Sequence, residues 1–152
     1  MNEAQECLGG AGYVKESILP RLYRQAPLNS IWEGSGNIQC LDVLRALKRD
    51  PGARDALLHE LAAARGGHPA FDASLKELTR ELDDPADQEP RARALVEHVA
   101  LLLQASLLLR AEQPMTAELF CASRLGRARG LAFGTLPVGT PFAPLLERAL
   151  AE

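Results

Sequence analysis

Two observations on the sequence predict an all-α fold. Hydrophobic residues make up 47% of the 152 residues and are mostly leucine and alanine, while aromatic residues account for only 5%. This usage is typical of helical bundles and not of sheet proteins. Apolar residues also recur at helical spacing in several segments that end at glycine or proline. A chain of this length is expected to form one ordinary domain, or a domain with an appendage.

The first third of the chain is predicted to be less regular than the rest. Residues 2–8 form the last turns of a helix that closes at Gly9, because glycine tolerates the left-handed conformation at a helix C-terminus. Residues 12–28 contain two prolines and are expected to form an ordered connection, with one helical turn near residues 18–23.

Three helices are predicted in the middle of the chain. The first begins after Ser35 and ends near Asp50, with Ser30 or Ser35 as its N-cap. The next two cover residues 53–64 and 69–82, and we expect them to form an antiparallel pair joined by a Gly-Gly turn.

The longest predicted helix covers residues 87–112. Its apolar residues extend widely around the helix, so it is expected to be the central and most buried one. A helix over residues 115–130 follows. Residues 131–144 contain three helix-breaking prolines and two glycines and are expected to be irregular, before a short terminal helix at residues 145–150.

Charge and cysteine usage exclude several classes of protein. The formal net charge of −3 lacks the basic excess of a dedicated nucleic-acid binder. Three distant cysteines suggest neither a disulfide framework nor a zinc site, and a reducing cytoplasm is expected. No leader opens the chain, and the apolar stretch from Val99 to Leu109 is too short to span a bilayer, so no membrane partner is expected.

Three segments near the N-terminus carry a family resemblance. Residues 31–39 read Ile-Trp-Glu-Gly-Ser-Gly-Asn-Ile-Gln, residues 8–13 read Leu-Gly-Gly-Ala-Gly-Tyr, and residues 19–24 read Leu-Pro-Arg-Leu-Tyr-Arg. Together they resemble the C-terminal helical domain of acyl-CoA dehydrogenases. The nearest branch is that of the AidB-like alkylation-response proteins, in which a similar Trp-Glu-Gly-Ser-Gly-Asn segment precedes a Cys-Leu-Asp-Val-Leu-Arg helix and a further helical extension.

The resemblance implies a longer parent protein. Residues 1–49 correspond to the distal part of the family's C-terminal domain, and residues 50–152 to an AidB-like extension. The parent would be an FAD-dependent dehydrogenase of acyl-CoA and a homo-oligomer, and this chain is expected to be a fragment that is inactive alone. The alternatives are a helical module for assembly or for binding double-stranded DNA, and a fragment without independent activity.

The resemblance also assigns the dehydrogenase residues. Glu33 occupies the position of the catalytic base, which removes the α-proton of the thioester. Gly10, Ser35 and Asn37 fall where relatives contact FAD. The alternatives are that Glu33 is favoured by the dipole of the following helix, and that the other three are ordinary capping residues.

Three neighbouring residues depart from the family pattern. Glu6 replaces a frequent glutamine near the flavin, so its cofactor role does not carry over. Arg24 lacks the aspartate that usually follows, and it is expected to hold the loop. Trp32 replaces a tyrosine and is expected to form pocket wall or core.

Two groups of basic residues could form a DNA-facing surface. Arg45 lies on the helix after the motif, and Arg124 and Arg127 lie near the end of a later helix. Phosphate contacts require only such clusters. The alternative is a solvated helix face, because acidic residues outnumber basic ones between the two groups. The three histidines lack ligand-like spacing, and no metal site is predicted.

Overall fold

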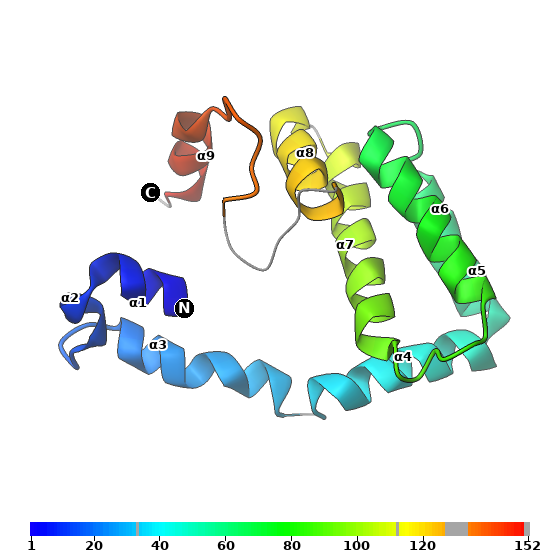
Figure 1. Cartoon of the computed structure of the whole chain (residues 1–152), viewed down its shortest axis with the longest axis horizontal. Helices are drawn as coiled ribbons and strands as arrows, with labels where there is room; N and C mark the ends of the chain where they lie inside the picture. The colour runs from blue at the N-terminus through cyan, green and yellow to red at the C-terminus, as the bar shows by residue number, and fades with distance from the viewer. Residues whose placement is uncertain (33, 112, 127–133, 151–152) are drawn as a thin grey trace. The chain divides into compact units, whose positions relative to one another are not determined.

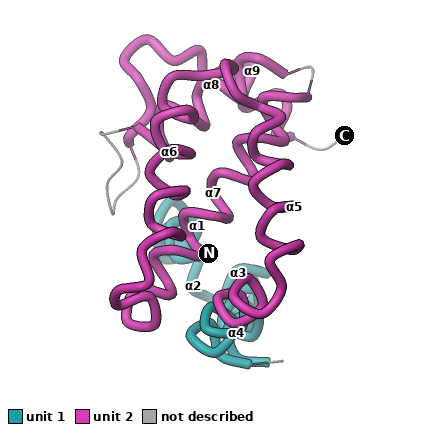
Figure 2. Tube along the Cα trace, turned by 90° about the vertical axis from the view of Figure 1, so that its right-hand side faces the viewer, with its two compact units in different colours: residues 1–42 teal, residues 43–152 magenta. Residues whose placement is uncertain are grey.

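The computed structural model describes residues 1–32, 34–111, 113–126 and 134–150, and within these ranges all regular structure is helical (Figure 1). The all-α prediction is therefore confirmed. The chain divides into two compact units, Met1–Asp42 and Val43–Glu152, which Figure 2 colours separately. The boundary lies inside α4 (Gly36–Arg49). The predicted domain division after residue 49 rests on the family resemblance and stays a prediction.

The first unit consists of short helices. These are α1 (Asn2–Leu8), α2 (Gly10–Tyr13), α3 (Leu19–Gln25), the 3₁₀ helix η1 (Ala26–Ser30) and the first turns of α4. The glycine at position 9 has a φ of 55° and ends α1, as predicted. Among the described residues of this unit, only Gly12 and Pro20 are buried.

The connection predicted over residues 12–28 is more helical than expected. Pro20 lies in the first turn of α3 and Pro27 in the first turn of η1. Proline suits this position because the first N–H groups of a helix have no intrahelical acceptor to lose. Both prolines therefore start helices here, whereas the sequence argument treated them only as interruptions.

The second unit contains the remaining helices. They are α5 (Pro51–Ala62), α6 (Pro69–Asp83), α7 (Ala92–Arg110), α8 (Pro114–Phe120), the π-helical turn η2 (Cys121–Leu125) and α9 (Phe142–Ala149). The helix predicted over residues 115–130 is thus shorter, and residues 127–130 lie outside the described part of the chain. The terminal helix begins three residues earlier than predicted.

Local features of the chain explain two shifted helix starts. α5 begins at Pro51 because the carboxylate of Asp50 accepts a hydrogen bond from the Gly52 N–H at 2.9 Å, an N-cap contact. α7 begins at residue 92, later than the predicted residue 87. Asp87 has a φ of 50°, which is incompatible with a right-handed helix, and Pro90 follows.

The α5–α6 pair is antiparallel, as predicted. Arg54 in the first turn of α5 pairs with Asp83 at the end of α6, so the two helices run in opposite directions. Gly66 in the connection has a φ of 81°, which glycine adopts without strain.

The second unit has a hydrophobic core around α7, which packs against α5, α6, α8 and η2 (Figure 1). The core consists of Leu61, Ala64, Phe71, Leu75, Leu78, Leu102, Ala105 and Cys121. By length and composition alone, α7 is apolar enough to cross a membrane. Its buried residues face neighbouring helices, and its packing against four elements confirms the predicted central position.

Candidate functional site

The predicted catalytic base, Glu33, lies outside the described residues. The residues just before it are exposed, since Ile31 keeps 65% and Trp32 keeps 56% of its surface accessible. Trp32 is therefore not the core aromatic that the sequence allowed. Gly34, which follows, has a φ of 111°, a conformation that favours glycine. The described residues on either side of Glu33 are therefore open to solvent or only partly covered.

Among the predicted flavin contacts, Gly10 is exposed at the start of α2, and a Cβ added there would meet nothing within 4 Å. The glycine that the packing requires is Gly12. A Cβ at Gly12 would lie 2.7 Å from the carbonyl oxygen of Gln5, and the Gln5 side-chain amide donates to the Gly12 carbonyl at 3.2 Å. Only glycine allows α1 and α2 to approach so closely.

Ser35 and Asn37 are exposed at the start of α4. The Ser35 carbonyl accepts the Gln39 N–H at 3.0 Å, which opens the helix. α2 packs against α1 and α3, whereas α4 does not pack extensively on α1, α2 or α3. Among the described residues, neither Ser35, Asn37 nor Gly10 lines the cavities of the first unit. Their assignment to FAD stays a prediction.

The first unit has two adjoining cavities. One, of about 1110 Å³, lies between α1 and α3 and is lined partly by Gln5, Tyr13 and Tyr23. The other, of about 440 Å³, lies at the connection between α2 and α3. Arg24 lines both, and among the described residues it makes no hydrogen bond or ion pair that would hold the loop.

The residues predicted to face DNA are not brought together. Arg45 is exposed on α4, and Arg124 is exposed in η2, which packs against α6, α7 and α8. Arg127 lies outside the described residues. Basic side chains are therefore present on separate elements, and a continuous DNA-facing surface stays a prediction.

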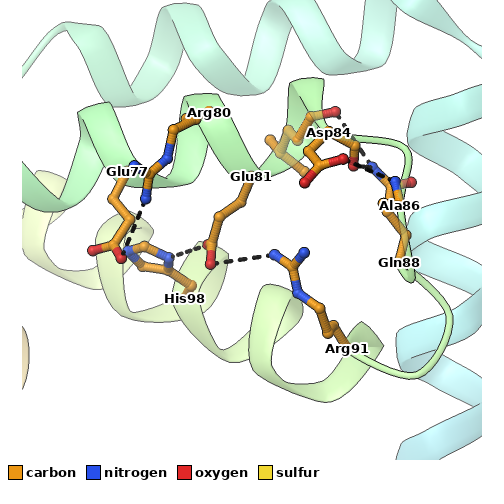
Figure 3. Close-up of polar contacts among 9 residues, drawn as sticks. Glu77, Arg80, Glu81, Asp84, Ala86, Gln88, Arg91 and His98 are labelled. Atoms are coloured by element: carbon orange, nitrogen blue, oxygen red, sulfur yellow. Dashed lines mark hydrogen bonds and ion pairs between the residues drawn. The ribbon is translucent and has the colours of Figure 1, made fainter.

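A polar network between α6 and α7 was missed by the sequence argument. The Nε2 atom of His98 lies 2.7 Å from the Ser74 hydroxyl, and its Nδ1 atom lies 2.9 Å from a carboxylate oxygen of Glu81. Arg91 donates to the other Glu81 oxygen at 3.4 Å (Figure 3). Ser74 and Glu81 are seven residues apart and share one face of α6, a spacing that the sequence displays. The position of His98 opposite them depends on how α7 packs.

The contacts of this network match a nucleophile, base and acid, but its surroundings do not support catalysis. Ser74 is only 8% exposed and lies inside α6, where backbone N–H groups donate along the helix. An oxyanion hole requires free donors beside the nucleophile. The network therefore satisfies buried polar groups and fixes α6 against α7.

The cysteines and acidic residues offer no metal centre in the described part of the chain. Cys7, Cys40 and Cys121 are free thiols. Burial raises the pKa of the Cys121 thiol to about 11, and the nearby charge of Glu118 contributes in the same direction. A thiol held protonated in this way is a poor nucleophile.

Comparison with known proteins relates the chain to one family and to individual relatives. Residues 1–48 match the family described as the C-terminal domain of acyl-CoA dehydrogenases. The AidB protein of Escherichia coli (strain K12), whose name assigns it to the acyl-CoA dehydrogenases, is 41% identical over 129 residues. That similarity covers 85% of this chain and so extends beyond residue 48 into the second unit.

A second relative comes from Caenorhabditis elegans. Acyl-CoA dehydrogenase family member 11 is 30% identical over 68% of this chain. The chain spans 24% of the length of the bacterial relative and 19% of the length of the nematode relative.

Proposed function

Because this chain carries the C-terminal domain of the acyl-CoA dehydrogenase family, with AidB homology through most of its length, we propose that it is the C-terminal part of an FAD-dependent acyl-CoA dehydrogenase-like flavoprotein. In the whole protein, Glu33 removes the α-proton of the acyl thioester. The chain alone does not catalyse this reaction.

The exposure of the apolar residues that flank Glu33 supports this proposal. A carboxylate that removes a weakly acidic α-proton requires a dry pocket that raises its pKa toward neutral. Ile31 and Trp32 before it are more than half exposed, and Ile38 after it is 58% exposed. Apolar side chains beside a catalytic base are expected to wall its pocket, so a further part of the enzyme has to cover this face.

The residues proposed for FAD suit only part of a cofactor site. Ser35 and Asn37 offer exposed polar groups at the start of α4, where helix N–H groups also favour a phosphate. Gly10 offers an open backbone. FAD would accept the β-hydride of the substrate when bound. Since none of the three lines a first-unit cavity formed by the described residues, we expect binding to depend on groups that other parts of the enzyme supply.

The test compares the isolated chain with the enzyme assembled around it. The purified chain should hold no flavin and should show no dye reduction driven by acyl-CoA. In the complete enzyme, Glu33→Gln should nearly abolish turnover while flavin absorbance persists, because glutamine keeps the shape and removes the base. Glu3→Gln, an exposed acid of the same unit, is the matched control.

Two results would contradict the proposal. Stoichiometric flavin bound to the isolated chain would show that the other domains are not needed for the cofactor site. Unchanged kcat in the Glu33→Gln enzyme would assign the base elsewhere.

The same exposed face is expected to make the isolated chain self-associate, because the part of the enzyme that covers it is not present. Large exposed apolar areas are uncommon on monomers and commonly mark interfaces. Sedimentation of the chain at micromolar concentration should show species heavier than a monomer, and Ile31→Ser with Ile38→Ser should shift the distribution toward the monomer. A compact monomer before substitution would argue against this interface.

A further inference from the structure

The connection between α2 and α3 gathers positive charge around one cavity. Lys15 lies in the connection, and Arg21 and Arg24 lie one turn apart on the same face of α3. All three line the cavity of about 440 Å³, together with Glu16 and Ser17. The lining therefore carries three cations and one acid, a formal excess of two positive charges.

These three cations have no ion-pair partner among the described residues. Four arginines of the second unit are placed differently, since Arg54, Arg80, Arg91 and Arg110 each pair with a carboxylate. Like charges one turn apart on a helix repel one another. The electrostatic repulsion among unpaired cations in a concave site falls when an anion binds between them.

The backbone of the connection adds further donors. The Ser17 hydroxyl accepts the Leu19 N–H at 3.2 Å, and the Ser17 N–H donates to the Val14 carbonyl at 3.0 Å. The N–H groups of Lys15, Glu16 and Ile18 have no acceptor within the part of the chain that the structure describes. Exposed N–H groups in a turn are common partners of phosphate oxygens.

We propose that this cavity binds a small phosphate-bearing ligand through Lys15, Arg21 and Arg24. A phosphate monoester carries a charge of about −1.5 to −2 near neutral pH, which matches the formal excess of the lining. Guanidinium groups bind phosphate oxygens in a two-pronged geometry, and the lysine supplies a further point charge. The site lies within ten residues of one unit, so it suits one phosphate group and not an extended polymer.

In the experiment, the full chain is titrated with pyrophosphate at constant ionic strength, and backbone NMR monitors the binding. We expect saturable shifts confined to the amides of residues 14–24. The double variant Arg21→Gln with Arg24→Gln should weaken pyrophosphate binding at least tenfold. The double variant Arg21→Lys with Arg24→Lys keeps the charge and should retain part of the affinity. Arg49→Gln with Arg93→Gln is the control, because it removes the same charge from exposed positions on other helices.

Helical circular dichroism of each variant separates loss of the site from loss of the fold. If a variant loses helix, pyrophosphate protection of Lys15 from amine acylation in the unaltered chain provides the second measurement. The proposal is overturned by absent or non-saturable shifts, or by equal weakening in the control pair, which would indicate diffuse charge attraction. It is also overturned if a DNA duplex competes at the same residues with higher affinity.

Discussion

Both units are helical, yet they differ greatly in how much apolar surface they bury. In the second unit, apolar residues of four helices and a π-helical turn meet in a core around α7. In the first unit, large apolar residues remain exposed, including Tyr13, Ile18, Ile31, Trp32 and Ile38. An amphipathic pattern thus predicts that one face of a helix becomes buried. Only the packing shows whether residues of the same chain bury it.

Core truncation should give the largest difference between the units. Phe71 is completely buried in the second unit, so Phe71→Ala should lower the free energy of unfolding by about 3–5 kcal/mol. Ile31→Ala removes an exposed side chain of the first unit and should change it by less than about 0.5 kcal/mol. Urea unfolding followed by circular dichroism measures both. Equal losses would show that the first unit has a core of its own.

The polar network offers the next largest effect. His98→Ala leaves the hydroxyl of Ser74 and the carboxylate of Glu81 without their shared partner, and should lower the free energy of unfolding by roughly 1–3 kcal/mol. His59→Ala, an exposed histidine of α5, is the matched control and should have little effect. Similar unfolding midpoints for the two variants would mean that the network does not hold α6 against α7.

The cysteines provide a smaller, pH-dependent comparison. Burial and Glu118 raise the pKa of Cys121 to about 11 from an ordinary value of 9.0. Well below pH 9 the thiol is protonated in both folded and unfolded chains. As the pH rises from 9 toward 11, the unfolded chain loses its proton first, so the folded state loses stability.

Cys121→Ala should therefore reduce the fall in the urea midpoint between pH 9 and pH 11. Cys7→Ala changes an exposed thiol of the first unit and should leave the fall unchanged. The assignment would be wrong if both variants retained the full slope.

The sequence predicted elements best where a single local signal decided them. Gly9 marked the end of α1, and the periodic apolar residues marked α4 and α6. The start of α7 was missed because the positive φ of Asp87 depends on the fold of the connection and is not encoded by a glycine.

Site prediction differed in the same way. The motif around Glu33 was visible in the sequence, and the family match over residues 1–48 agrees with it. The network around His98 was not predicted, because it joins residues up to 24 positions apart on two helices. The assignment of Gly10 to FAD stays a prediction, and the contact between α1 and α2 requires a different glycine, Gly12. A motif locates a functional segment, and packing decides which of its residues make the contacts.

The smallest expected effect concerns DNA, and it tests whether the charge of the second unit acts as one surface. Arg45 and Arg124 lie on elements that do not pack together extensively, and the chain has a net charge of −3. Duplex binding should therefore be weak, indifferent to sequence and steeply reduced by salt, because phosphate contacts release counterions without reading bases.

Replacing Arg45, Arg124 and Arg127 with alanine should lower both the affinity and the salt slope. Substituting the exposed cations Arg65, Lys76 and Arg93 removes equal charge and should matter less. A duplex titration at two salt concentrations decides the question. No binding at the lower salt concentration would exclude DNA as a partner of this chain. Equal losses of affinity in both triple variants would show that binding depends on net charge alone and not on a particular surface.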